Sequence, residues 1–132
     1  MAAADLDVVR RVWEEALAAP VWAGPEVWVH GDLRPANLLV HDGRLGAVLD
    51  FGDLAVGDPA TDLISGWMLF QGDAREAFRR ASGADDATWA RGRGWAASIS
   101  LVCLASSADN PVTAGVGRRG VDALVAERRS TP

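Results

Sequence analysis

The dipeptide Asp42-Gly43 constrains the fold more than any other feature, because it separates two apolar runs and favours a two-residue type I′ turn. Residues 38–50 are therefore predicted to form a β-hairpin. The turn also fixes the register, in which the following residues lie opposite one another: His41 and Arg44, Val40 and Leu45, Leu39 and Gly46, Leu38 and Ala47, and Asn37 and Val48.

The predicted register sorts the hairpin side chains by chemistry. Alternate residues of a strand point to opposite faces, so one face receives only apolar side chains, namely Leu38, Val40, Leu45, Ala47 and Leu49. Asn37 and Asp50 fall on the other face, one diagonal step apart, with Cβ atoms roughly 7–8 Å from each other. Mg²⁺, which binds oxygen ligands at about 2.0–2.1 Å, would fit between two such side chains.

A third polar residue, Asp32, lies five residues before Asn37, where the run Val-Trp-Val-His-Gly-Asp ends. A carboxylate beside apolar segments needs a cation or hydrogen bonds, because burying it unpaired is unfavourable. The chain around Asp32 can fold back so that this residue lies close to Asn37 and Asp50. An acid placed beside a metal in this way can orient or deprotonate a hydroxyl group. A plainer interpretation makes Asp32 a turn residue, Asn37 a loop amide and Asp50 the end of a strand.

The spacing Asp-x₄-Asn, followed thirteen residues later by Asp-Phe-Gly, is typical of phosphoryl-transfer enzymes of the protein-kinase kind. Here "HGD" stands where protein kinases carry His-Arg-Asp. With "HGDLRPANLLV", "AVLDFGDLAVGDPATDL" and the tryptophan-bearing helix that follows, residues 27–70 resemble the aminoglycoside phosphotransferase family, which includes choline-kinase-like and other small-molecule kinases.

The resemblance implies a role for each of these polar residues. Asp32 would be the catalytic base, and Asn37 and Asp50 would bind the metal. The implied cofactors are Mg²⁺ and ATP or another nucleoside triphosphate, and the γ-phosphoryl group would move to a hydroxyl group of a small molecule. The implied fold class is α+β and mostly helical, a protein-kinase-like C-terminal lobe with a catalytic loop and a β-hairpin followed by helices.

Three further polar residues are expected to support the site. Asp58 suits the N-cap of a helix whose first residue is Pro59, and Asp62 suits the first turn of that helix. The family resemblance suggests that Asp62 also accepts hydrogen bonds from the catalytic-loop backbone. His30 is expected to be structural, with its ring hydrogen-bonded to nearby backbone. Arg91 is expected to be solvated.

Hydrophobic periodicity predicts helices along most of the remaining chain and a short strand at 27–29. The predicted helices cover residues 5–19, 57–70, 73–82, 85–108 and 110–129. Gly92 and Gly94 interrupt the pattern in the fourth of these segments, and Gly115, Gly117 and Gly120 weaken it in the last.

Residues 1–132 are predicted to form one domain, in which the family's N-terminal nucleotide-binding lobe is absent. Kinase-type catalysis uses a glycine-rich loop and a strand lysine, whereas this chain contains no lysine and only 29 residues precede His30. We therefore expect little or no activity from the chain alone. Apolar surface left open towards the missing lobe would favour self-association.

Charge and hydropathy narrow the partners and the location. The net charge is −5 and there is no basic run, so neither nucleic acid nor an anionic membrane is an expected partner. The negative charge favours a cationic substrate. The sequence shows no signal peptide and no membrane-spanning run, so the cytoplasm is the expected compartment.

Two other functions are compatible with the sequence. One is a non-catalytic remnant that binds a cation or a small molecule in an acidic cleft. The other is a metal-dependent phosphoesterase, although the chain has only two histidines, His30 and His41, with which to build a metal cluster.

Overall fold

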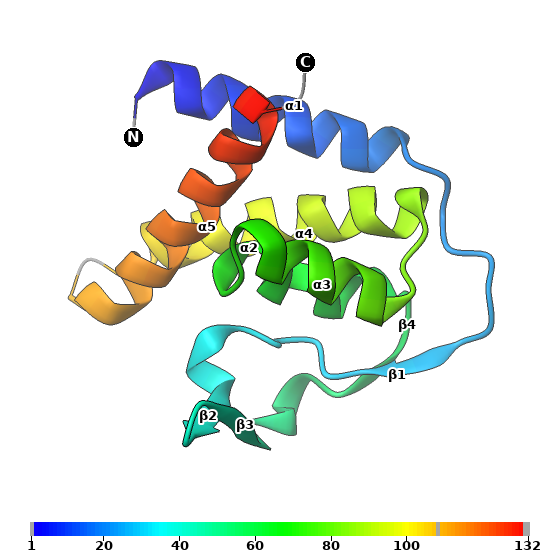
Figure 1. Cartoon of the computed structure of the whole chain (residues 1–132). Coiled ribbons are helices and arrows are strands. Elements are labelled where there is room, and N and C mark those ends of the chain that lie inside the picture. Colours follow the sequence, from blue (N-terminus) through cyan, green and yellow to red (C-terminus); the bar gives the residue numbers. More distant parts are fainter. Residues whose placement is uncertain (1, 108, 131–132) are drawn as a thin grey trace.

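The structure, a computed structural model, describes residues 2–107 and 109–130 and consists of a helical body with two small two-stranded sheets beside it (Figure 1). This confirms the predicted α+β, mostly helical fold class. The elements are, in chain order, α1 (Ala3–Ala18), β1 (Val27–Val29), η1 (Pro35–Asn37), β2 (Leu38–His41), β3 (Arg44–Val48), η2 (Phe51–Asp53), β4 (Ala55–Gly57), η3 (Pro59–Ile64), α2 (Ser65–Met68), α3 (Gly72–Ser82), α4 (Asp86–Ala105) and α5 (Pro111–Ser130).

Helix α4 is the central element of the helical body. It packs against α1, α5, α2 and η3, and its buried residues cover most of its circumference, whereas Trp95 and Val102 on the remaining side are exposed. A helix with so wide a buried face needs small or apolar residues on most of its sides. The indole rings of Trp89 from α4 and Trp67 from α2 lie 4.5 Å apart between ring centroids at the centre of this core.

The glycines that interrupt the predicted helical patterns lie inside continuous helices. A Cβ atom on Gly94 would lie 2.4 Å from the Cβ of Ala16 in α1, and a Cβ on Gly120 would lie 2.0 Å from Ser100 Oγ in α4. Both distances are too short for any larger residue. The glycines therefore mark where helix backbones approach closely, an effect that outweighs their low helix propensity.

The segment predicted as a helix over 57–70 begins as a 3₁₀ helix, η3, and continues as the short α2. Its start matches the prediction, because the Asp58 carboxylate accepts a hydrogen bond of 3.0 Å from the Ala60 N–H and Pro59 occupies the first turn. Helix α3 ends at Gly83, whose φ of 67° is the left-handed conformation that favours glycine after a helix.

The Asp42-Gly43 turn forms as predicted, with positive φ at both residues, 49° and 73°. The predicted register is correct only next to the turn, where His41 pairs with Arg44 and Val40 with Leu45. Between Leu39 and Val40 the register shifts, so Leu39 faces Ala47 and Leu38 faces Val48. The three predicted pairs beyond Val40 are therefore wrong.

A one-residue irregularity explains this error. Gly46, which was predicted to pair with Leu39, is the residue passed over, and glycine within a strand often marks such a bulge. The single apolar face is consequently not formed. Val40 and Leu45 also remain 67% and 61% exposed, so the hairpin is not buried as its composition suggested.

The second sheet joins two segments that lie far apart in sequence. Strand β1 pairs antiparallel with β4, with Trp28 opposite Val56. The sequence predicted β1 but not β4, which has only three residues. This pairing carries the end of β1 to the start of η3, where the loop that begins with His30 is held.

Candidate active site

The loop after β1 is shaped by His30, which is buried. Its Nδ1 accepts a hydrogen bond of 3.3 Å from the backbone N–H of Asp32, so its Nε2 carries the proton and donates to the Leu49 carbonyl at 2.8 Å. The His30 ring also packs against the Phe51 ring, with centroids 4.8 Å apart. Both ring nitrogens are thus used by the backbone, which is the structural arrangement expected for this histidine.

Asp62 anchors the same loop from η3. Its two carboxylate oxygens accept hydrogen bonds of 2.7 Å from the His30 N–H and 2.9 Å from the Gly31 N–H. The predicted backbone contacts of Asp62 are therefore present, and its contribution to catalysis stays a prediction. Gly31 has a φ of 86°, and a Cβ there would lie 2.5 Å from the Asp53 carbonyl oxygen, so this position requires glycine.

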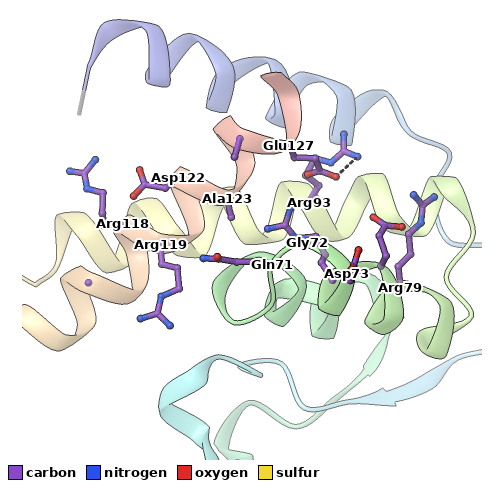
Figure 2. A pocket seen from close by; sticks show the side chains of 14 residues that line it. Gln71, Gly72, Asp73, Arg79, Arg93, Arg118, Arg119, Asp122, Ala123 and Glu127 are labelled. Carbon is purple, nitrogen blue, oxygen red and sulfur yellow. Dashed lines mark hydrogen bonds and ion pairs between the residues drawn. The ribbon is translucent and has the colours of Figure 1, made fainter. Parts of the chain in front are cut away.

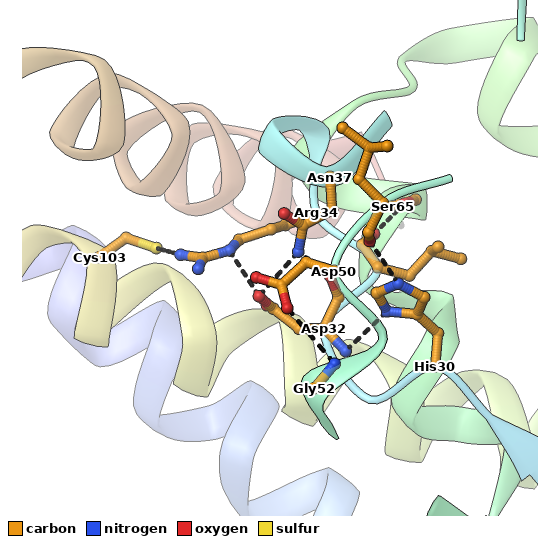
Figure 3. A network of polar contacts seen from close by, with 10 residues as sticks. His30, Asp32, Arg34, Asn37, Asp50, Gly52, Ser65 and Cys103 are labelled. Carbon is orange, nitrogen blue, oxygen red and sulfur yellow. Dashed lines mark hydrogen bonds and ion pairs between the residues drawn. The ribbon is translucent and has the colours of Figure 1, made fainter. Parts of the chain in front are cut away.

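The structure brings Asp32 and Asn37 into direct contact. Asn37 Nδ2 donates to the Asp32 carboxylate Oδ2 at 2.9 Å and to the Asp32 backbone carbonyl at 2.8 Å (Figure 3). Asn37 is buried, and the Asp32 side chain is 16% exposed. Because the amide nitrogen is held by Asp32, the amide oxygen is left for another ligand, and no group in the described part of the chain donates a hydrogen bond to it.

Asp50 comes to the site from the end of β3. The Leu49 N–H donates to the Asn37 carbonyl at 2.8 Å, so Asp50 follows the residue opposite Asn37 instead of lying a diagonal step away. Its backbone is left-handed, with φ 59° and ψ 73°, and its Oδ1 accepts a hydrogen bond of 3.3 Å from the Gly52 N–H. In Figure 3 its carboxylate is directed to the region of Asp32 and Asn37.

These donors fit a magnesium ion by their chemistry. An amide oxygen from Asn37 and a carboxylate from Asp50 are hard oxygen ligands, and Mg²⁺ is usually held by one or two such groups together with water and substrate phosphates. Across residues 2–107 and 109–130, no three His, Cys, Asp or Glu side chains lie together in a way that could hold a metal. A site built on Asn37 and Asp50 would therefore need phosphate and water ligands.

Sequence reasoning missed Arg34, two residues after Asp32. Its Nε donates to Asp32 Oδ2 at 2.9 Å, and its Nη1 lies 3.9 Å from Cys103 Sγ (Figure 3). Burial alone would lower the pKa of the Arg34 guanidinium, but the Asp32 carboxylate and Cys103 reverse this, so its pKa is raised and the charge is retained. The only signal in the sequence was that a basic residue, Arg34, lies two positions after an acidic one, Asp32.

The expectation that Arg91 is solvated is wrong. Its side chain is 12% exposed and pairs with the Asp58 carboxylate, at 2.6 Å from Nε and 3.2 Å from Nη2. It also donates to the Pro20 carbonyl and to Thr88 Oγ1. Arg91 thereby joins α4 to the start of η3 and to the segment after α1, a set of contacts that helical periodicity cannot reveal.

A groove of about 1170 Å³ lies between α3 and α5 (Figure 2). It is rich in arginine, and acidic residues accompany the arginines; Arg93, for example, lies 3.4 Å from Glu127. The charged lining residues are Arg75, Arg79, Arg93, Arg118, Arg119, Asp73, Glu76, Asp122 and Glu127. The groove takes no lining residue from the loop that carries Asp32.

The fold is that of a mostly helical, kinase-like fragment, with an acid, an amide and a second acid at one end of a hairpin. The model of the phosphotransferase enzyme family (APH) matches residues 2–95. The chain therefore belongs to this phosphotransferase family, which confirms the resemblance to aminoglycoside phosphotransferases.

Two relatives support this membership. The N-acetylmuramate/N-acetylglucosamine kinase of Neisseria meningitidis serogroup B is 41% identical over 59 residues, which are 42% of this chain and 17% of that protein. The apoenzyme crystal structure of the macrolide 2′-phosphotransferase MphH from Brachybacterium faecium is 31% identical, with a TM-score of 0.50; the match covers 100% of this chain and 43% of that one. The chain thus corresponds to less than half the length of either relative.

Within the described ranges, none of the helices combines the length and the hydropathy that a bilayer crossing requires.

Proposed function

We propose that this chain is the catalytic part of a small-molecule kinase that moves the γ-phosphoryl group of ATP, or of another nucleoside triphosphate, to a substrate hydroxyl. The observation that supports this most is the contact between the Asp32 carboxylate and the Asn37 amide at 2.9 Å, at the end of the hairpin that presents Asp50. Family membership makes phosphoryl transfer the reaction to expect from such a group.

In this proposal Asp32 is the general base. Its carboxylate accepts the proton of the acceptor hydroxyl while the hydroxyl oxygen forms a bond to the γ-phosphorus and the bond from that phosphorus to the nucleoside diphosphate breaks. The Asn37 amide and the Arg34 guanidinium hold Asp32 Oδ2, which leaves Oδ1 to receive the proton.

The Asn37 amide oxygen and the Asp50 carboxylate would hold Mg²⁺. When bound, the ion neutralises charge on the nucleotide phosphates and aligns them for transfer. The contribution of the chain is to keep the two oxygen donors in place. Asn37 is fixed by its two hydrogen bonds to Asp32, and Asp50 by its left-handed backbone and its contact with Gly52.

The proposal includes a second, nucleotide-binding lobe outside these 132 residues. The match to 43% of the macrolide phosphotransferase chain supports it, and so does the absence of lysine from this sequence. Large apolar side chains are also exposed on the strands, on η2 and in the segments between them: Trp28, Leu39, Val40, Leu45, Leu49, Phe51, Leu54 and Val56. A lobe packed against these side chains would cover them, and without it they would favour self-association.

The substrate in this proposal is a small hydroxylated molecule that is phosphorylated in the cytoplasm. One relative is named as an N-acetylmuramate/N-acetylglucosamine kinase and the other as a macrolide 2′-phosphotransferase, and both names describe phosphorylation of small molecules. The net charge of −5 favours a cationic acceptor. This is the charge of the whole chain, however, and it does not give the charge of the site itself.

Reconstitution tests the proposal. The 132-residue chain would be fused to the part of the macrolide phosphotransferase that it does not match, and ATP-dependent phosphorylation would be followed over a panel of alcohols, sugars, macrolides and aminoglycosides. We expect transfer by the fusion and little or none by the chain alone. Asp50→Ala should abolish transfer, and the matched variant Asp42→Ala, in the exposed hairpin turn, should retain it.

Two results would contradict the proposal. Transfer by the fusion that survives Asp50→Ala would remove this residue from the metal site. Calorimetric binding of Mg²⁺ and ATP that is the same with and without the Asp50 carboxylate, in a fusion that transfers no phosphoryl group, would instead support the non-catalytic binding remnant.

A further inference from the structure

A cavity of about 400 Å³ lies between the end of α4 and the start of α5. Its lining is polar and includes Arg34, Cys103, Ser107, Asp109, Asn110 and Thr113. Arg34 is the residue that connects this cavity with the candidate active site, because it also touches the Asp32 carboxylate. The α3–α5 groove, although larger, has no such connection.

One guanidinium group separates the cavity from the proposed base. Arg34 is 2.9 Å from Asp32 Oδ2 through Nε and 3.9 Å from Cys103 Sγ through Nη1, so its side chain extends from the base to the cavity wall (Figure 3). A small molecule in the cavity would therefore contact Arg34, the residue whose guanidinium holds Asp32 Oδ2.

The chemistry of the lining is that of hydroxyl and amide groups. Ser107 Oγ donates to the Cys103 carbonyl, which leaves its oxygen able to accept, and Asn110 Oδ1 accepts from the Thr113 N–H at 3.1 Å, which leaves the Asn110 amide nitrogen as a donor. The Thr113 hydroxyl adds a group that can donate and accept. Such groups recognise hydroxyl groups of a ligand without requiring charge.

The charges of the lining are balanced. Among the described residues that line the cavity, Arg34 is the one cation and Asp109 the one acid. An ammonium group that approached Asp32 would meet the Arg34 guanidinium, which already neutralises that carboxylate at 2.9 Å. Like charges at such separations repel, whereas a neutral hydroxyl group has no such cost.

We infer that this cavity receives the acceptor and that the acceptor is an uncharged, hydroxyl-rich molecule of the monosaccharide type, not a polycation. The inference rests on the proposed function, because it takes Asp32 as the base. It differs from the cationic substrate that the net charge of the chain favours. Arg34 is then the residue that sets the charge preference, in addition to positioning Asp32.

Two sugars that differ in one substituent test this. Glucose and glucosamine would be titrated into the isotopically labelled chain at mildly acidic pH, where the amine of glucosamine is protonated, and backbone amide shifts would be followed by NMR. We expect glucose to shift the signals of Ser107 and Thr113 and glucosamine to bind at least about fivefold more weakly. Arg34→Gln should reduce that difference, and Arg44→Gln, on the exposed hairpin, should preserve it.

The inference is overturned if glucosamine binds as well as glucose, if neither sugar shifts these signals, or if the shifts map to the α3–α5 groove. Its failure can be told from failure of the proposed function. Asp50-dependent transfer to a polycationic acceptor by the two-lobe fusion would retain the kinase and reject the acceptor class. Glucose binding in the cavity, with no phosphoryl transfer by the fusion, would retain the cavity and reject the kinase.

Discussion

The carboxylate of Asp62 receives a 2.7 Å hydrogen bond from the backbone N–H of His30, 32 residues earlier in the chain. Its second oxygen receives the Gly31 N–H at 2.9 Å. The loop that carries Asp32 is therefore fixed by an acid from η3 and not by its own sequence alone. Hydrogen bonds to a carboxylate are stronger than those between neutral groups, so this anchor contributes to both stability and geometry.

Replacing Asp62 by Ala should destabilise the fold. The backbone N–H groups of His30 and Gly31 would lose a charged acceptor. We therefore expect a loss of about 2–4 kcal/mol in the free energy of unfolding. Urea denaturation followed by tryptophan fluorescence measures this. Asp122→Ala, at an exposed position of α5, is the control and should stay within about 0.5 kcal/mol of the parent. Equal stability of the two variants would show that the anchor is dispensable.

Two glycines of α5 should respond in opposite directions to alanine. A Cβ on Gly120 would lie 2.0 Å from Ser100 Oγ, so Gly120→Ala should destabilise the protein by about 1–3 kcal/mol through overpacking. Gly115 has no atom within 4 Å of its Cβ position, so Gly115→Ala should stabilise by roughly 0.5–1 kcal/mol through helix propensity. Thermal unfolding of the pair gives the comparison, and a stabilising Gly120→Ala would mean that α4 and α5 are not closely packed there.

The left-handed backbone of Asp50 predicts a conflict between stability and activity. Glycine adopts a φ of 59° without steric penalty, so Asp50→Gly should raise the free energy of unfolding by up to about 1 kcal/mol. The same change removes the proposed metal ligand and should abolish transfer by the two-lobe fusion. Asp42→Gly, at a φ of 49°, should gain similar stability and keep its activity. A destabilised Asp50→Gly would show that the carboxylate contact with Gly52 outweighs the backbone strain.

Asp85, the N-cap of α4, should account for part of the loss of stability at acid pH. Hydrogen bonds from Thr88, first from its side chain and then from its backbone, lower the pKa of the Asp85 carboxyl below its ordinary 3.8. Because the folded pKa lies below the unfolded one, this cap stabilises the fold above the unfolded value and is lost as the pH falls through the folded value.

Asp85→Asn should keep a capping side chain but remove this titration. The variant should therefore lose less stability than the parent between neutral pH and the acid range below the ordinary carboxyl pKa, as measured by urea unfolding at a series of pH values. Asp122→Asn provides the control and should retain the parent's pH dependence. Parallel curves for Asp85→Asn and the parent would contradict the assignment.

Local chemistry explains which parts of the fold were predictable. The Asp42-Gly43 turn, the Asp58 cap and the end of α3 at residue 82 each depend on residues within a few positions of one another, and all three occur as predicted. The predicted hairpin register beyond Val40 was wrong because the structure passes over Gly46 in the pairing. The alternation of apolar residues in the sequence gives no sign of this irregularity. Strand β4 was missed because its three residues pair only with the distant β1.

Packing explains the remaining differences. Gly94 and Gly120 lower helix propensity when only the sequence is considered, yet each allows a neighbouring helix to approach within a distance that a side chain would prevent. The sequence predicted Asp32, Asn37 and Asp50 as one group, and the structure shows a contact between Asp32 and Asn37. Arg34 was missed because its importance comes from a contact with Asp32 and a neighbour, Cys103, that lies 69 positions further along the chain.

The proposed kinase activity depends most on Asp32 acting as the base of phosphoryl transfer, and the turnover number of Asp32→Asn in the two-lobe fusion tests this role most directly. Asparagine keeps the shape and can still contact Asn37, but it cannot accept the hydroxyl proton. We predict a fall in kcat of about 10²–10⁴-fold with little change in the KM for Mg·ATP, since Asn37 and Asp50 remain. A kcat equal to that of the parent fusion would contradict the catalytic assignment.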